Sequence, residues 1–176
     1  MRIKPTDRQI VVDLETLSAR PNSCIVSIGA VAFTLQDGIT EEFLINVDPM
    51  SCKNLGLHIS KETVEWWSTQ PKEAIESWKK DPVPLEVALE KFNDFYGPTS
   101  VPIWGNGSSF DITILESAYI AVNDSKTDIP WKFWDIYDLR TLTNILGRKL
   151  VKTGINHNAL HDSIAEAKLL IDMLKS

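Results

Sequence analysis

The sequence predicts an α/β fold in which a mixed five-stranded sheet is flanked by helices. Apolar runs rich in β-branched residues recur in the first 47 residues, and short polar connections join them, which is typical of antiparallel strands. A segment with helical signals, residues 60–96, then leads to another apolar run at 101–104. Crossovers of this length usually join parallel strands of one sheet. The sheet is therefore expected to begin with antiparallel strands and to continue with parallel ones.

The first three strands are expected at residues 10–16, 24–34 and 42–47. The first is a nearly continuous β-branched run, which indicates a strand covered on both faces. Gly29 interrupts the second run and predicts either a bulge or a close approach of another backbone. Residues 50–59 show no regular pattern, and we expect a loop there.

The expected helices begin where capping residues precede helical spacing. Ser60 is a typical N-cap residue, Ser108 or Ser109 is expected to cap a later helix, and Pro71 and Pro84 suit a first helical turn. Gly147 suits the position just after a helix. The helices are expected over 61–70, 71–78, 84–96, 108–122, 139–146 and 158–175, and the last two strands over 101–104 and 135–138.

The composition is that of a soluble globular protein. The chain has 176 residues, 43% hydrophobic and 24% charged, and we expect one domain over residues 1–176. The net charge of −6 argues against a broad surface that grips duplex DNA, because phosphate neutralisation drives such binding. We see no membrane-spanning run and no secretory signal, and two cysteines without metal-like spacing fit a cytoplasmic protein.

Two acids close the first predicted strand. Asp13 and Glu15 lie on one side of it, about 6–7 Å apart, since successive side chains alternate between faces. Like charges this close to an apolar core favour a proton or a bound cation. Carboxylate oxygens suit Mg²⁺ or Mn²⁺. A strand end frayed into solvent, with two free acids, explains the pair equally well.

Two further acids fall on apolar helix faces. Asp111 begins the stripe that continues with Leu115, and Asp162 groups with Leu169 and Met173 at about 100° per residue. An unpaired acid on a buried face is costly, so a counter-charge is expected. For Asp111 alone, a favourable contact with the helix dipole is the alternative explanation.

A histidine and a glycine turn carry further possible chemistry. His157 is expected in the loop that enters the last helix, where a histidine can act as a general base near neutral pH or simply be a surface residue. With His161 it has the spacing of a zinc-protease motif, but Asn158 replaces the glutamate base. Residues 105–110 resemble a dinucleotide turn, with Phe110 in place of the third glycine.

Taken in order, three motifs resemble those of the DEDDh 3′-5′ exonucleases. They are Asp13-x-Glu15-Thr16, then Asn106-Gly-x-x-Phe110-Asp111, then His157-x-Ala159-x-x-Asp162. A smaller group is more similar still, the phage exonuclease A type and its actinobacterial exoribonuclease relatives. That likeness includes Thr63-Val-Glu-Trp66-Trp67 with Gln70, and it runs from about Ile10 to Leu174.

The resemblance implies a ribonuclease-H-like fold and a metal-dependent hydrolase. It implies that two Mg²⁺ or Mn²⁺ ions are held by four carboxylates, Asp13, Glu15, Asp111 and Asp162, and that His157 takes the proton of the attacking water. Nucleoside 5′-monophosphates would then be released from the 3′ ends of single-stranded DNA or RNA. A homodimer is possible by the same resemblance.

The resemblance also suggests substrate-binding residues. Thr16 and the backbone around Leu14 are expected to hold the terminal sugar, and Asn106 and Phe110 belong to the second motif. His58 lies in a segment similar to the family's His-Gly-Ile, with Ile59 in place of glycine.

Trp67 could stack on a base, although its spacing with Val64 is also typical of a helix core. Two other functions stay open at this point. One is a catalytically silent nucleic-acid-binding module of the same fold, and the other is a nucleotide-binding oxidoreductase suggested by the glycine turn.

Overall fold

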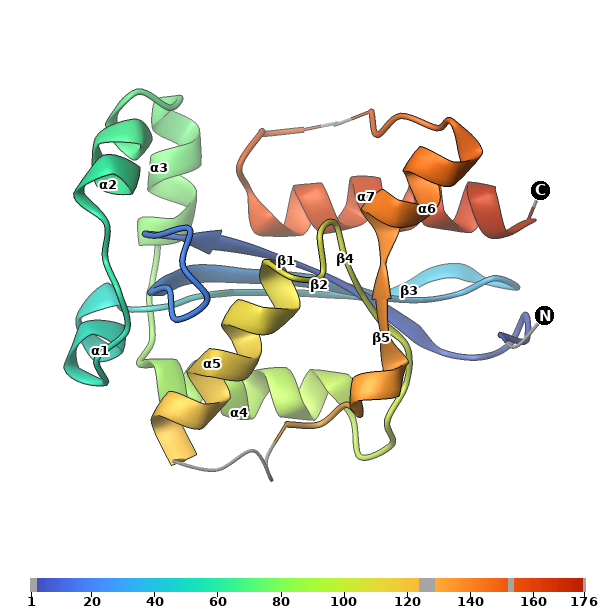
Figure 1. Cartoon of the computed structure of the whole chain (residues 1–176), viewed down its shortest axis with the longest axis horizontal. Helices are drawn as coiled ribbons and strands as arrows, with labels where there is room; N and C mark the ends of the chain where they lie inside the picture. The colour runs from blue at the N-terminus through green and yellow to red at the C-terminus, as the bar shows by residue number, and fades with distance from the viewer. Residues whose placement is uncertain (1–2, 124–128, 152–153, 176) are drawn as a thin grey trace.

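A five-stranded mixed sheet runs through the protein, with helices on both of its faces (Figure 1). The computed structural model describes residues 3–123, 129–151 and 154–175. The strand order is β3-β2-β1-β4-β5, with β1 antiparallel to β2 and parallel to β4. This arrangement confirms the predicted fold class. The strands are β1 (Gln9–Thr16), β2 (Ile25–Thr34), β3 (Gly38–Asn46), β4 (Ile103–Gly105) and β5 (Ile136–Asp138).

Helices α4 and α5 lie against one face of the sheet, and α7 lies against the other (Figure 1). Alternate residues of β1 serve the two faces, since Val12 and Leu14 pack with the α4–α5 core and Val11 packs with α7. The helices are α1 (Pro49–Asn54), α2 (Lys61–Ser68), α3 (Lys72–Lys79), α4 (Leu85–Tyr96), α5 (Asp111–Asn123), α6 (Leu139–Leu146) and α7 (Ala159–Lys175), with a 3₁₀ turn, η2, over Phe133–Asp135. In the described ranges, no helix combines the length and apolar character needed to cross a membrane.

Gly29 is the point where α7 touches the sheet most closely. A Cβ placed on this residue would lie 2.1 Å from the carbonyl carbon of Ala159. The Ser163 hydroxyl donates to the Gly29 carbonyl oxygen at 2.9 Å and so ties α7 to β2. Of the two alternatives for Gly29, the close backbone approach is confirmed. Because Gly29 pairs with Asp13 across the two strands, the contact also fixes the start of α7 beside Asp13.

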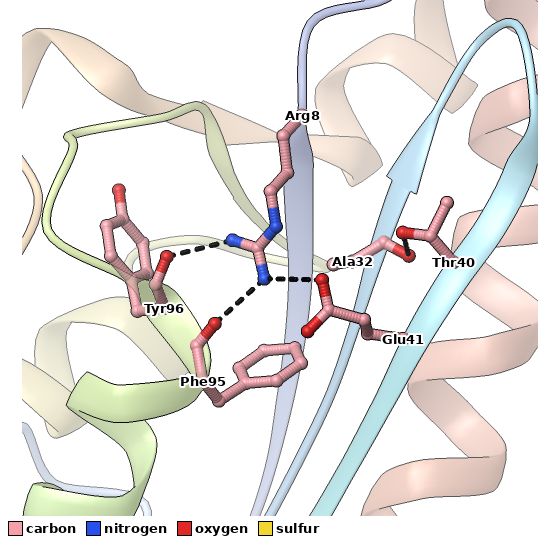
Figure 2. Close-up of polar contacts among 6 residues, drawn as sticks. All are labelled: Arg8, Ala32, Thr40, Glu41, Phe95 and Tyr96. Carbon is pink, nitrogen blue, oxygen red and sulfur yellow. Dashed lines mark hydrogen bonds and ion pairs between the residues drawn. The ribbon is translucent and has the colours of Figure 1, made fainter.

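Arg8 ties the beginning of β1 to the end of α4 (Figure 2). Its guanidinium donates to the carbonyl oxygens of Tyr96 and Phe95, each at 2.8 Å, and reaches Glu41 on β3 at 3.3 Å. These carbonyls belong to the last turn of a helix, where they have no partner within the helix. The crossover helix and two strands are thereby joined at one side chain.

The expected loop at residues 50–59 is wrong over its first five residues, because α1 covers Pro49–Asn54. The Asp48 carboxylate accepts from Met50 N at 3.0 Å, and proline occupies the first helical position. Buried Cys52 attaches the short helix to the core. The capping signal at Asp48-Pro49 was present in the sequence, but a six-residue helix is too short to show a period.

The expected capping of the next helix by Ser108 or Ser109 is also wrong, since α5 begins only at Asp111. The amide and hydroxyl of Ser108 donate instead to the Asp138 carboxylate at the end of β5, at 2.9 and 3.2 Å. This serine therefore joins the turn after β4 to the neighbouring strand.

Candidate active site

One cavity of about 420 Å³ brings together the acids that the motifs place far apart in the sequence. Asp13 and Glu15 come from β1, where they face Gly29 and Ser27 of β2. Asp111 is the first residue of α5, directly after the turn that follows β4. Asp162 lies in the first turn of α7. All four carboxylates line this cavity, as does His157.

The acids are largely shielded from solvent. Glu15, Asp111 and Asp162 are 7%, 4% and 3% exposed. The frayed strand end considered for β1 is therefore excluded, because Glu15 lies inside regular pairing and is buried.

The surroundings of Asp13 disfavour the charged form of its carboxyl. Burial raises the pKa of the Asp13 carboxyl well above its usual range, and four nearby carboxyls raise it further: Asp111, Glu166, Glu15 and Asp162. Buried like charges are stable together only when protons or cations neutralise them.

The pKa of the Asp111 carboxyl is also raised, but a hydrogen bond and a nearby cation offset part of the rise. Burial raises the pKa of its carboxyl to about 7, against the opposing effect of a hydrogen bond from Leu14 N at 3.2 Å and of the nearby Arg140 guanidinium. The bond to Leu14 also connects α5 directly to β1.

The cluster fits a divalent cation. One ligand atom each of Glu15, His157 and Asp162 lies within 4.8 Å of the other two, so the two carboxylates are close enough to share an ion and the imidazole stands beside it. Hard cations prefer carboxylate oxygens, and an ion here would offset the repulsion that raises the pKa of Asp13.

His157 stands in the loop before α7, as predicted, and its backbone is unusual. Its φ of 60° lies in the left-handed region that non-glycine residues rarely adopt. The ring packs edge-on against Trp66, with 4.9 Å between centroids, and against Trp67 at 6.2 Å. A strained backbone held by two aromatic rings indicates an imposed position for the imidazole.

Five of the six expected substrate-binding residues line the same cavity: Leu14, Thr16, Trp67, Asn106 and Phe110. Trp67 is buried, and its indole N–H donates to the Thr16 carbonyl at 2.9 Å, so it supports this wall of the cavity. Trp66 is 43% exposed and is the more accessible ring of the two.

His58 lies outside this cavity. It lines an adjoining pocket of about 400 Å³ that shares Ser18, Ala19 and Thr63 with the acid cavity. Its Nδ1 is 2.7 Å from the Ser18 hydroxyl.

Sequence analysis missed two charged residues of the cavity, Glu166 and Arg140. Glu166 is 1% exposed and follows Asp162 by one helical turn, so helical spacing alone would have placed it beside that acid. Arg140 lies in the first turn of α6, and no pattern in the sequence predicts that it lies near these acids.

The architecture of the sheet and helices defines the fold class of this protein. Its strand order and flanking helices are those of the ribonuclease-H-like fold, and the likeness to solved nucleases agrees with this. E. coli exonuclease I, solved with a 5cy-dA13 oligonucleotide, superposes with a TM-score of 0.66 at 14% identity, over 97% of this chain and 40% of that one. Cell-death related nuclease 4 superposes with a TM-score of 0.58 at 17% identity, over 97% and 64%. The chain thus spans less than two thirds of these solved proteins.

Sequence comparison narrows the class to a family. Residues 8–174 match the Rv2179c-like 3′-5′ exoribonuclease domain, and the chain belongs to this family. An exodeoxyribonuclease of Enterobacteria phage T4 is 25% identical over 201 residues, covering 94% of this chain and 86% of the relative. The recognised resemblance to DEDDh exonucleases is confirmed. The matches give no support to the oxidoreductase suggested by the glycine turn.

Proposed function

We propose that this protein is a metal-dependent 3′-5′ exonuclease that releases nucleoside 5′-monophosphates from the 3′ ends of single-stranded DNA or RNA. Membership of the exoribonuclease family supports the reaction class. The observation that carries the proposal is the convergence of four buried or partly buried acids and His157 on one cavity.

We propose that Asp13, Glu15, Asp111 and Asp162 hold two Mg²⁺ or Mn²⁺ ions. Bound there, such ions supply Lewis acidity that lowers the pKa of a water and neutralises charge on the phosphate. The raised pKa of Asp13 supports this assignment, since an empty cluster of carboxylates is electrostatically unfavourable.

The proposed role of His157 is to accept the proton of the attacking water at a ring nitrogen. Imidazole is suited to this because its pKa lies near neutrality. Contact with Trp66 and Trp67 keeps the ring at the edge of the acid cluster, so that the base is oriented before substrate arrives.

The wall formed by Thr16, Leu14 and Trp67 is proposed to hold the terminal nucleoside, with Phe110 and Asn106 on the side of α5. Phe110 and the Trp66–Trp67 pair offer apolar surface for a base. His58, in the adjoining pocket, is proposed to contact a part of the substrate outside the acid cavity.

The test is degradation of oligonucleotides labelled at the 5′ end, as DNA, as RNA and as duplexes with 3′ overhangs, with EDTA, Mg²⁺ or Mn²⁺. A 3′-5′ exonuclease gives a ladder of products shortened from the 3′ end, and only with a cation. Asp111→Asn provides the inactive control. Intact substrate under every metal condition, together with binding of the strand, would instead identify a silent binding module.

We propose a domain organisation, a cellular location and an oligomeric state as well. Residues 1–176 form a single exonuclease domain, which limited proteolysis would test. The protein acts in the cytoplasm, where reduced thiols persist, in keeping with its buried free cysteines Cys24 and Cys52. The family resemblance makes a homodimer possible, and light scattering of the purified protein would test it.

A further inference from the structure

Arg140 is a cationic side chain in an otherwise acidic cavity. Five carboxylates line the cavity: Asp13, Glu15, Asp111, Asp162 and Glu166. Among the described residues that line it, Arg140 and His157 are the basic ones. A guanidinium group is cationic, so Arg140 brings a positive charge into this site.

The guanidinium is held at a defined place. Its Nη2 donates to the Asn106 carbonyl oxygen at 2.6 Å. It also lies over Gly107, where a Cβ would come within 3.3 Å of its Cζ and Nη1. Gly107 has a φ of 102°, a conformation that suits glycine and leaves room for the arginine.

Most of its hydrogen-bonding capacity is left for a ligand. A guanidinium has five N–H donors in a planar fork. In the described parts of the chain, its one hydrogen bond is that to Asn106, and it forms no ion pair despite the neighbouring acids. An exposed fork with unused donors beside a cluster of acids is suited to a phosphate group, which it can bind through two oxygens.

The position of α6 indicates which phosphate of the bound strand Arg140 contacts. The terminal nucleoside is proposed to lie against Thr16 and Trp67, on the side of α2. In Figure 1, α2 and α6 lie on opposite sides of the first turn of α7, which carries Asp162. A strand whose scissile phosphate sits at the acids, with its 3′ end toward α2, therefore presents its next phosphate toward α6.

We infer that Arg140 binds the phosphate adjacent to the scissile one, on the 5′ side of the cleaved bond. The inference rests on the proposed function and deepens it, because it predicts a preference for strands that carry this second phosphate. The residue then acts in substrate binding and contributes to KM more than to kcat.

Two dinucleotides that differ by a single phosphate test this directly. TpT contains only the scissile phosphate, whereas pTpT adds a 5′ phosphate at the adjacent position; ApA and pApA serve if the enzyme prefers RNA. For the wild type, we expect KM to be roughly 10-fold to 100-fold lower with the 5′ phosphate, the range for a charge-assisted hydrogen bond. In Arg140→Gln, this ratio is expected to fall to about 1, and Arg140→Lys is expected to retain part of it.

Arg148→Gln is the matched control. Arg148 lies just after α6 but pairs with Asp172 at 3.5 Å, away from the cavity, and the ratio is expected to stay at the wild-type value. An equal loss of activity with both dinucleotides in Arg140→Gln would overturn the inference, because it would indicate an effect on the scissile phosphate or on Asp111. An unchanged ratio would overturn it as well.

Failure of the proposed function is distinguishable from failure of this inference. If the wild type leaves the labelled oligonucleotides of the first assay intact under every metal condition, the nuclease proposal fails. Whether or not the dinucleotides are cleaved, equilibrium binding of TpT and pTpT in Mg²⁺ still tests Arg140. Tighter binding of pTpT that Arg140→Gln abolishes would support the phosphate contact, and equal binding of both dinucleotides by the wild type would refute it.

Discussion

Replacing Gly29 with alanine should separate the first turn of α7 from the sheet. The added methyl carbon would lie 2.1 Å from the carbonyl carbon of Ala159 and 2.3 Å from Leu160 N. Ordinary van der Waals contact begins at 3.4 Å, so one of the two backbones has to move by about 1 Å. Neither group can rotate away, because both belong to regular structure.

The expected cost has two parts. Overpacking a tight contact usually costs about 1–3 kcal/mol, and the upper end applies here because the clash is with backbone. Separation of the elements also weakens the bond from Ser163 to the Gly29 carbonyl, worth about 1 kcal/mol. Since His157 and Asp162 flank the displaced turn, a shift of about 1 Å is expected to lower kcat roughly 100-fold.

Urea unfolding and oligonucleotide degradation measure the two effects separately. Gly38→Ala is the control, since Gly38 has a φ of 80° and no heavy atom within 4 Å of the added carbon. It is expected to cost about 1–2 kcal/mol through backbone strain alone and to leave kcat unchanged. If Gly29→Ala lost less than about 0.5 kcal/mol and kept wild-type kcat, the proposed role of this contact would be refuted.

Three other perturbations follow from the site. Asp13→Asn should abolish cleavage yet raise the free energy of unfolding in EDTA, because it removes a carboxylate whose charged form is disfavoured by burial and by four nearby carboxyls. A variant that unfolds at lower urea concentration than the wild type would contradict this. The Asp111 carboxyl has a pKa of about 7 in the folded protein but near 4 in the unfolded chain, so between these values the folded state binds the extra proton. The free energy of unfolding in EDTA should therefore fall as pH rises from 5 to 8, and Mg²⁺ should reverse the fall. Thermal unfolding curves that do not change over this pH range would contradict the prediction. Trp67→Phe should lower the free energy of unfolding by about 1–3 kcal/mol, because the buried Thr16 carbonyl loses its hydrogen-bond donor, and it should raise KM. Wild-type stability and KM would show that Trp67 does not support this wall of the cavity.

The sequence predicted the elements that have a clear period or a clear cap. The β-branched runs identified β1 and β2 almost to the residue, and Ser60 was correctly assigned as the cap of α2, where its hydroxyl accepts from Thr63 N. The acids on apolar helix faces were recognisable for the same reason. Asp111 and Asp162 interrupt stripes that otherwise bury hydrophobic side chains.

What the sequence did not predict depends on contacts between distant segments. Helix α1 is too short for a period and is held by Cys52 in the core. Ser108 binds Asp138 on a neighbouring strand instead of capping its own helix. Arg140 reaches the acids only because α6 follows β5, which pairs with β4, and this pairing is not visible in the local sequence.

The placement of α7 has a consequence for biosynthesis. This helix covers β1 and β2, carries Asp162 and follows the loop with His157, yet it is synthesised after the other described helices and strands. A nascent chain that lacks α7 already contains Asp13, Glu15, Asp111 and the loop with His157, but it lacks Asp162. Domains tend to fold as units during translation. A nuclease built in this order therefore gains its proposed activity only after α7 has been synthesised and has packed on the sheet.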